Sequence, residues 1–512
     1  MGHVRSGTLF LVLFISGLFL NAKSSYWDDR EKFIRKEKSR ELGADLVLNE
    51  KEEKVNEILM NYKLRELDEG MLNPAGYLPA QHFFHSKKAM DKSKVFNLIQ
   101  KLPKGASLHS HDTGIASEEF LLSLTHKENL YGCERGQNFL LKFFKDNSSL
   151  DNSCQWKSLK KMRAQRKDFE EFLRGKLSLV VADPMVKYPD LNSVWRAFIN
   201  LFRNVGNMIG YKPVFQEYFY QVLKELHEDN VMYMEMRGLL PEVYDLDGKI
   251  YSPEEVVGLY VETLEHFKHD YPSFYGAKLI YAPSRHVDNS TVDNYLKILK
   301  NIQKLYPDFI AGFDLVGQED LGKPLSEFIP QLLEIKDQTK FFFHAGETNW
   351  EGETDLNLID AVLLNTTRIG HGYAILKHPE VYRAAKKNRI AIEVSPISNQ
   401  VLKLVDDLRN HPAAILVADG YPVVICCDDP SFWGAKGLSY DWYYAFMSFG
   451  SRDSDLKLLK QLAINSIAYS SLDLVDNSDL LTKWQLSWNT FIDDVLKEHG
   501  VMYSKPRSIV DV

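Results

Sequence analysis

Two pairs of chemically versatile residues follow short apolar runs in the sequence. His109 and His111 are separated by one residue at the end of the run Ala106–Asp112. Because side chains alternate along a strand, both imidazoles would point to the same face, as half of a metal site does. His344 and Glu347 follow three consecutive phenylalanines. Burial of an unpaired imidazole or carboxylate costs several kcal/mol, so these residues need partners, and a metal ion and a substrate would provide them.

Two further polar clusters end apolar runs nearer the C-terminus. His371 lies between Gly370 and Gly372, which leave little side-chain bulk to shield it. We therefore expect an exposed imidazole that can handle protons. Asp428 and Asp429 are adjacent after another apolar run. Two such carboxylates repel each other in a low dielectric, and a cation between them and the histidines removes that repulsion.

Four of these residues form an imidazole-rich ligand set with one carboxylate and no thiolate: His109, His111, His344 and Asp428. Such donors suit one Zn²⁺ per chain, with a water molecule in the open position. Zinc can lower the pKa of that water to about 7. Glu347 remains as a general acid or base, and His371 as a second proton-handling group. The residue types predict metal-assisted hydrolysis at an electrophilic carbon, and they do not name the substrate.

Eight β-rich runs, separated by helical segments, must position these clusters. The runs are Ala106–Asp112, Val231–Arg237, Ala277–Ala282, Ile310–Val316, Lys340–Ala345, Thr367–Gly370, Ile390–Val394 and Tyr421–Cys427. Alternation of strand and helix eight times predicts an α/β fold of the (β/α)8 TIM-barrel type, with parallel strands buried on both faces. All four clusters lie at the carboxyl ends of runs, where barrel active sites lie. The alternative is four unrelated polar clusters, each satisfied by its own neighbours.

A long interval separates the first two runs. It spans about 118 residues, whereas a strand–helix–strand unit needs about 30. We therefore expect residues 123–182 to form a subdomain inserted into a barrel of residues 101–512. Cys133 and Cys154 are the only well-separated cysteine pair, and an oxidising compartment would join them in a disulfide. The basic stretch KSLKKMRAQRK could bind a cell-surface receptor or a glycosaminoglycan, or it could be a solvated helix face.

The N-terminus has the features of a secretion signal over residues 1–24. His3 and Arg5 precede an apolar run of 13 residues that ends at Leu20, and small and polar residues follow. A membrane-spanning helix needs about 20 residues. A buried or membrane-anchoring helix is the alternative interpretation. The signal predicts a secreted, extracellular protein.

Residues 25–100 are charged and have a helical pattern. One apolar stripe consists of Val55, Ile58, Leu59 and Tyr62. This stripe must be buried on something, and two partners are open. It would pair two subunits in a homodimer, or it would dock on the barrel of its own chain.

The overall composition restricts the class of protein. The chain has 512 residues, and Lys+Arg 62 against Asp+Glu 70 gives a net charge of −8, which argues against nucleic acid as a partner. Four cysteines cannot form a disulfide scaffold, and we expect Cys426 and Cys427 to be two packed thiols. If the chain is secreted, three sequons predict glycosylation at Asn147, Asn289 and Asn365.

Six segments, taken in order, resemble the adenosine deaminases: LPKGASLHSHD, AGFDLVGQED, FFFHAGET, RIGHGYAI, IEVSPISN and ICCDDP. The signal, the helical N-terminal segment and the insertion are more similar to the adenosine deaminase growth factors, the extracellular adenosine deaminase 2 type. The resemblance implies a secreted zinc enzyme that hydrolyses adenosine, and 2′-deoxyadenosine, with release of ammonia. The cytidine-deaminase type of zinc site needs a PCxxC motif, which this sequence lacks.

The resemblance also implies a role for each site residue. It places zinc on the four ligands already named. Glu347 would protonate N1 of the purine and make C6 electrophilic, which stabilises the charge that develops on the ring. His371 would orient or deprotonate the attacking water, which Asp428 would also hold. Asp429 would bond N7. The remaining substrate contacts are the N–H of Gly317 to N3 and the ribose contacts of Asp112 and Trp195.

One position departs from the family pattern. Some extracellular members have a histidine near Ser284 that helps to hold the ribose, and His286 is the nearest substitute here. Two alternatives to adenosine deamination remain open. The enzyme would act on another adenine compound, such as AMP or adenine, or the chain would be a receptor-binding growth factor that acts independently of catalysis.

Overall fold

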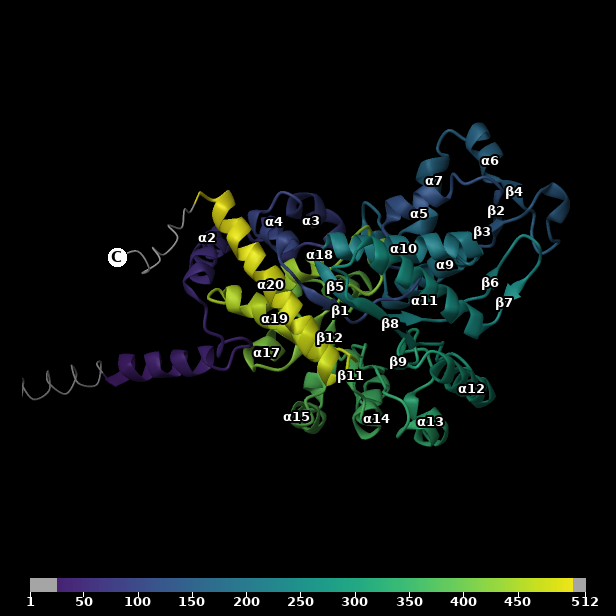
Figure 1. Ribbon diagram of the computed structural model, residues 1–512. Helices are drawn as coiled ribbons and strands as arrows, with labels where there is room; N and C mark the ends of the chain where they lie inside the picture. The colour runs from purple at the N-terminus through teal and green to yellow at the C-terminus, as the bar shows by residue number, and fades with distance from the viewer. Residues whose placement is uncertain (1–24, 501–512) are drawn as a thin grey trace, which may run out of the picture.

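The computed structural model describes residues 25–500. The predicted signal peptide, residues 1–24, lies outside this part of the chain. Residues 25–38 are helical and project away from the body of the molecule (Figure 1). Over the described range, none of the helices combines the length and the apolar character that crossing a membrane requires.

Eight parallel strands form the centre of the molecule, one for each predicted run (Figure 1). They are β1 Gly105–Ser107, β5 Val231–Gly238, β8 Gly276–Tyr281, β9 Ile310–Phe313, β10 His344–Ala345, β11 Arg368–His371, β12 Ala391–Val394 and β13 Val423–Ile425. They form two four-stranded sheets in the orders β1-β5-β8-β9 and β10-β11-β12-β13. Nearly all their residues are buried. The predicted α/β class with parallel strands is confirmed.

Backbone pairing also joins the outer strands of the two sheets. Phe313, at the end of β9, forms a parallel bridge with Phe341 ahead of β10, and Ser110, after β1, forms one with Asp428 after β13. The N–H of Asp428 donates to the carbonyl oxygen of His109 at 3.2 Å. The first and eighth strands therefore end beside each other, although they lie far apart in the sequence.

Helices alternate with these strands, as the pattern predicts. The main ones are α9 Leu191–Ile209, α10 Lys212–Glu228, α11 Pro253–Asp270, α12 Asn289–Leu305, α13 Ile329–Ile335, α14 Asn357–Leu363, α15 Pro379–Lys387, α16 Pro396–Val401, α17 Ala413–Ala418, α18 Ser439–Tyr444, α19 Leu456–Ala468 and α20 Leu474–Glu498. Helix α11 shows how the sequence starts them. Ser252 accepts the N–H of Glu255, and the Glu255 carboxylate accepts the N–H of Ser252, so two otherwise unpaired donors are satisfied.

The N-terminal segment packs against the C-terminal helices. Helix α2 spans Glu50–Leu72 and is followed by α3 Phe83–Met90 and α4 Lys94–Lys101. Within the predicted stripe, Val55 and Leu59 are buried, and Ile58 and Tyr62 are partly buried. Helix α2 packs on α19 and α20, so the stripe docks on its own chain. Subunit pairing through residues 25–100 stays a prediction.

The region between β1 and β5 contains a small antiparallel sheet with the order β3-β2-β4. Its parts are β2 Leu130–Arg135, β3 Asn138–Phe143, β4 Lys157–Ser158, α5 Glu118–Leu124, α6 Leu159–Gln165 and α7 Phe169–Leu177. The disulfide Cys133–Cys154 is present, and Cys426 and Cys427 are free and buried. The limits 123–182 stay a prediction, because α9 also packs on β3.

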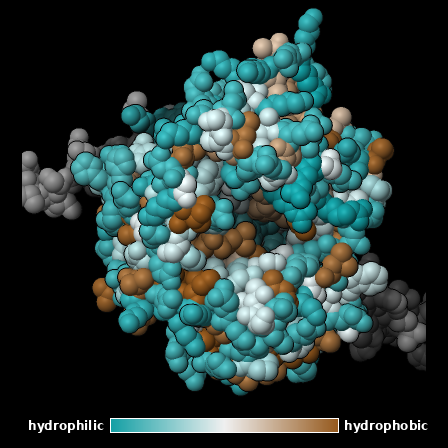
Figure 2. All heavy atoms as spheres, turned by 90° about the vertical axis from the view of Figure 1, so that its right-hand side faces the viewer, coloured by the Kyte–Doolittle hydropathy of each residue, from teal (hydrophilic) through white to brown (hydrophobic). Residues whose placement is uncertain are grey.

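A second short hairpin, which the sequence pattern did not predict, follows β5. It consists of β6 Val243–Tyr244 and β7 Ile250–Tyr251. This hairpin and the β2–β4 sheet lie on the right of Figure 1. The same side faces the viewer in Figure 2, where the mostly hydrophilic surface is hollowed near its centre and hydrophobic residues gather around the hollow.

Candidate active site

The four predicted ligands lie together at the carboxyl ends of the strands. His109 and His111 follow β1, His344 begins β10, and Asp428 follows β13. The ring centroid of His109 is 4.6 Å from that of His344 and 5.3 Å from that of His111. Oδ1 of Asp428 is 3.1 Å from Nε2 of His111 and 3.4 Å from Nε2 of His109. Parallel pairing of the segments after β1 and β13 produces this convergence.

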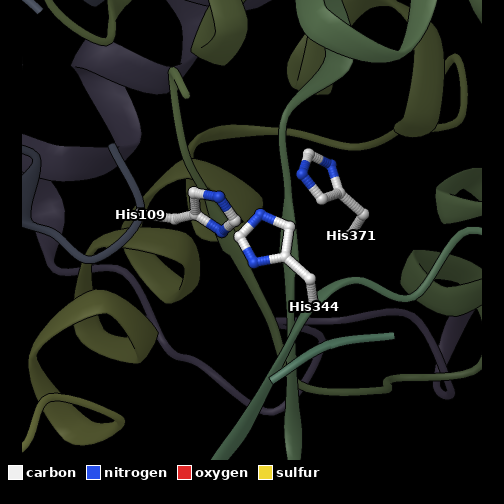
Figure 3. A group of neighbouring side chains, drawn as sticks. All are labelled: His109, His344 and His371. Carbon is white, nitrogen blue, oxygen red and sulfur yellow. The ribbon is translucent and has the colours of Figure 1, made fainter. Parts of the chain in front are cut away.

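His371, the last residue of β11, belongs to the same cluster. Its ring centroid is 4.9 Å from that of His109 and 5.1 Å from that of His344 (Figure 3). Among the described residues, two groups have ligand atoms within 4.8 Å of one another: His109, His344 and His371, and His109, His111 and Asp428. By its position, His371 is therefore a further candidate ligand, which the sequence did not predict.

The expectation of an exposed His371 is wrong, because only 2% of its surface is accessible. Gly370 instead allows the neighbouring rings to pack closely. A Cβ at Gly370 would lie 3.2 Å from Cε1 of His109 and 3.3 Å from the ring of His344. The absence of a side chain therefore lets the imidazoles approach one another. His371 itself has φ of +60°, a strained backbone conformation of the kind found at functional sites.

The donor atoms are arranged as a bound cation requires. Nε2 of His109 and Oδ1 of Asp428 are buried and have no hydrogen-bond partner. The other ring nitrogens are occupied: Nδ1 of His109 lies 2.7 Å from Glu393, and Nδ1 of His344 lies 2.6 Å from Asp314. Carboxylates placed behind ligand histidines in this way fix the ring orientation and leave Nε2 free. These residues therefore fit a metal ion.

Burial and local contacts set the protonation of two predicted ligands. It lowers the pKa of His344 to about 3, so this ring is neutral at physiological pH and has a lone pair for a metal. Burial also raises the pKa of Asp428, but contacts with His109 and His111 outweigh it and hold that pKa well below its usual range. Both groups are thus in the state that metal binding needs.

A network of buried charges lies behind the predicted ligands. Arg237 donates to Asp314 at 2.8 Å and to Glu393 at 2.8 Å, and these are the two carboxylates that contact His344 and His109. Arg368 donates to Glu393 at 2.5 Å and to Glu235 at 2.8 Å. Burial raises the pKa of Glu393, but Arg237 and Arg368 outweigh it and hold that pKa well below its usual range.

The sequence interpretation missed this network. Glu235 and Arg237 interrupt the apolar letters of β5, and Glu393 interrupts those of β12. A charged residue in a strand that is buried on both faces requires a buried partner. That signal was present, but the sequence alone did not say which charges would meet.

Glu347 has the properties of a buried acid. Oε1 lies 3.6 Å from Nε2 of His371. Burial raises the pKa of the Glu347 carboxyl well above its usual value, and the charges of Asp428 and Glu319 raise it further. A protonated carboxyl can donate to a substrate. Glu319, which was also missed, positions this loop because it accepts the N–H groups of Gly346 and Glu347 at 3.1 and 3.0 Å.

The two predicted carboxylate contacts to substrate, Asp112 and Asp429, follow β1 and β13. Oδ1 of Asp429 is buried without a hydrogen-bond partner, and a Cβ at Gly114 would lie 2.0 Å from it, so the space beside it depends on that glycine. Burial raises the pKa of Asp429 well above its usual value. Asp112 accepts hydrogen bonds from the N–H of Leu239 and the hydroxyl of Tyr260, and burial raises its pKa to about 6.

The loop after β9 brings together the other predicted contacts. Gly317 has φ of +113°, and a Cβ there would lie 2.9 Å from the ring of His286. His286 therefore lies beside the backbone that was expected to meet the purine. Gln318 donates to Asn192 at 2.7 Å, which joins this loop to the start of α9, the helix that carries Trp195. Trp195 is buried.

Comparison with known proteins identifies the family. Models for the N-terminal region of adenosine/AMP deaminases and for adenosine deaminase match residues 8–99 and 180–485. An adenosine deaminase from Phlebotomus duboscqi is 45% identical over 94% of this chain and 93% of its own length. Human adenosine deaminase 2 is 41% identical, with coverage of 96% and 98%. The chain belongs to the adenosine deaminase family. Its likeness to the adenosine deaminase 2 type confirms the family that the sequence motifs indicated.

As a member of this family, the protein is a hydrolytic enzyme with adenosine deaminase activity. Solved structures show the same fold at lower identity. The N6-methyl-AMP deaminase of Arabidopsis thaliana has a TM-score of 0.55 and 18% identity, with 77% of this chain and 99% of that chain covered. An adenine deaminase from Arthrobacter aurescens has a TM-score of 0.54 and 19% identity, with coverage of 76% and 99%.

Proposed function

We propose that this adenosine deaminase binds one Zn²⁺ per chain through His109, His111, His344 and Asp428. The main support is the pair of buried donor atoms without hydrogen bonds, Nε2 of His109 and Oδ1 of Asp428. Three imidazoles and one carboxylate are also typical zinc ligands. An amidohydrolase from Burkholderia ambifaria with the same fold was solved with bound Zn. When bound, the metal supplies Lewis-acid activation of a water molecule near neutral pH.

The residues of the chain then carry out the remaining catalytic steps. Glu347, kept protonated by burial, gives its proton to N1 of the adenine ring, so that C6 accepts the oxygen of water without a full negative charge on the ring. His371 orients or deprotonates that water, and Asp428 holds it from the other side. One proton of the water restores the Glu347 carboxyl, and the other goes to the amino group, which leaves as ammonia when the tetrahedral carbon collapses to inosine, or to 2′-deoxyinosine from 2′-deoxyadenosine.

Four further residues hold the nucleoside. Asp429, whose carboxyl burial keeps protonated, donates to N7, and the N–H of Gly317 meets N3. Asp112 and Trp195 contact the ribose. Some extracellular members have a histidine near the position of Ser284, and His286, beside Gly317, takes its role here. AMP and adenine remain the alternative substrates.

Two substitutions test this assignment. We expect Glu347→Gln to lower kcat by about 10² to 10⁴, because a general acid contributes about that much, with the metal content unchanged. We expect His344→Ala to lose the metal. The measurements are ultraviolet absorbance with adenosine and metal analysis of the purified protein. Glu351→Gln, an exposed change in the same loop, is the matched control. Full activity of Glu347→Gln, or a full metal content in His344→Ala, would contradict the proposal.

We also propose that the eight strands close into a (β/α)8 barrel, supported by the two bridges that join the sheets. Secretion after removal of residues 1–24 is supported by the disulfide Cys133–Cys154, because disulfides persist in oxidising compartments. Asn147, Asn289 and Asn365 are exposed, as glycosylation requires. Mass spectrometry of the secreted protein, before and after removal of N-linked glycans, tests these points together.

The growth-factor role remains a separate proposal. Extracellular adenosine depletion would promote growth through catalysis, whereas a receptor or glycosaminoglycan bound by the region 123–182 would act without it. Glu347→Gln separates the two. Growth promotion that survives this change undiminished would show that signalling does not run through adenosine removal. Pairing of subunits through residues 25–100 is tested by sedimentation of the protein with and without residues 25–48, the segment that precedes α2.

A further inference from the structure

A chain of hydrogen bonds lies directly behind His371. Nδ1 of His371 is 3.2 Å from Nδ2 of Asn399, and Oδ1 of Asn399 is 2.9 Å from Nε2 of His411. The backbone N–H of Ala413, in the first turn of α17, donates to Nδ1 of His411 at 3.0 Å. The three side chains are 0–3% exposed, so this chain of hydrogen bonds, the relay, is shielded from solvent.

The relay has only one consistent direction. The N–H of Ala413 is a backbone donor and cannot accept, so Nδ1 of His411 must be the acceptor. The ring of His411 lies against Tyr373 and Phe449, and burial lowers its pKa to about 3. It is therefore neutral, with its single proton on Nε2, which donates to Oδ1 of Asn399.

This direction also fixes the amide of Asn399. A flipped amide would direct its N–H groups at the Nε2–H of His411, so that two donors would face each other in a buried site. With Oδ1 held by His411, the amide directs Nδ2–H at His371. Nδ1 of His371 is then the acceptor, and its proton lies on Nε2, on the side of Glu347 and the other histidines.

We propose that Asn399 and His411 are positioning residues that hold His371 in its Nε2–H tautomer, so that the ring donates a hydrogen bond to the attacking water and is neither its base nor a metal ligand. This inference rests on the proposed function and decides between the two roles left open for His371. A nitrogen that carries hydrogen has no lone pair for a metal. The group His109, His344 and His371 is thereby excluded as the ligand set, and no proton moves through this ring.

The location of the protons can be measured without any assay of activity. The test is neutron diffraction from crystals of the full chain exchanged into heavy water at neutral pH. We expect deuterium on Nε2 of His371 and on Nε2 of His411, with both Nδ1 atoms bare. Deuterium on Nδ1 of His371 would overturn the proposal. Because this readout is independent of turnover, its failure leaves the tests with Glu347→Gln and His344→Ala unaffected.

Kinetics of Asn399→Asp provide a second test. The carboxylate replaces the donor with an acceptor, so the proton of His371 moves to Nδ1 and Nε2 loses its hydrogen. The wrong tautomer of the serine-protease histidine costs about 10⁴ in kcat. We expect a loss of at least about tenfold in kcat here, with KM within about threefold, because Asn399 has no place in the nucleoside site. An unchanged kcat would contradict the proposal.

Two changes at His411 distinguish the effect of its hydrogen bond to Asn399 from the effect of the space that its ring fills. His411→Leu removes the donor to Asn399, and we expect kcat to fall. His411→Gln can still donate from its amide, and we expect it to recover most of the loss. The melting temperature and metal content of each variant identify misfolding. Equal losses in both variants would mean that the ring only fills space. His378→Gln, which changes a separate histidine bound to Asp355, is the matched control.

Discussion

Two of the regions that contain buried charges pair them differently. Between the strands, Arg237 pairs with the carboxylates of Asp314 and Glu393. Arg368 pairs with those of Glu235 and Glu393. Under α2, Lys63 is also fully buried, but it donates to the carbonyl oxygens of Ser451 and Ser454 at 2.8 and 2.6 Å. It forms no ion pair with a residue between 25 and 500.

The difference in pairing decides whether the pKa of a buried group lies near neutral pH. The carboxylates around Arg237 have pKa values below their usual range, so they remain charged and hold the rings of His109 and His344. Burial without a carboxylate partner lowers the pKa of Lys63 to about 7. One region is therefore insensitive to pH near neutrality, and the other titrates there.

Loss of Arg237 should have the largest effect. Arg237→Met leaves Asp314 and Glu393 buried without their shared partner, and we expect the free energy of unfolding to fall by about 3–5 kcal/mol. The metal content of the purified protein should fall with it, because both carboxylates orient ligand histidines. Urea unfolding and metal analysis measure these effects. Arg203→Met, at an exposed position on α9, is the control, and an equally small effect of both changes would contradict the argument.

The pH dependence of stability should distinguish Lys63. Above pH 7 the folded lysine loses its proton, whereas the unfolded lysine, with a pKa of about 10.4, keeps it. The unfolded state then binds more protons, so stability rises with pH between about 7 and 10, by up to about 1.4 kcal/mol per unit. We expect Lys63→Met to abolish this rise. Urea unfolding at several pH values is the measurement, and a rise that persists in the variant would show that another group titrates.

The smallest effect is expected at an exposed pair. Lys101 and Glu498 lie 2.5 Å apart, and about half of each side chain is exposed. Ion pairs of this kind contribute about 0–1 kcal/mol. Lys101→Ala should change the free energy of unfolding by less than about 0.5 kcal/mol, and addition of salt should remove even that difference. A loss comparable to that of Arg237→Met would mean that burial does not control the strength of these pairs.

Much of the fold could be predicted because strands buried on both faces appear as continuous apolar runs. Each of the eight runs overlaps a strand. The predicted ends of the strands were less accurate. Only the first two residues of the run Ala106–Asp112 belong to β1, Gly105–Ser107, because the chain leaves the sheet as it approaches Asp428. The hairpin β6–β7 escaped prediction because strands of two residues leave no periodic pattern.

The site was predictable to the extent that its residues have unusual chemistry. Histidines and aspartates after apolar runs are conspicuous, and the structure places them together. Glu319, Asn399 and His411 were missed because polar residues in loops are ordinary. Their importance arises from the atoms that they meet, such as the N–H of Glu347 for Glu319. The exposure of His371 was misjudged because neighbouring glycines allow close packing as readily as they allow access to solvent.

The contact between Ser110 and Asp428 has a consequence for synthesis of the chain. Two of the candidate ligands are translated early, and the last is translated only after every other strand has emerged. A nascent polypeptide that stops before β13 cannot assemble the centre, however well its earlier strands have formed. Such long-range closure slows folding, and the apolar faces and unpaired strand edges of the unfinished chain stay exposed to aggregation until the final strand arrives.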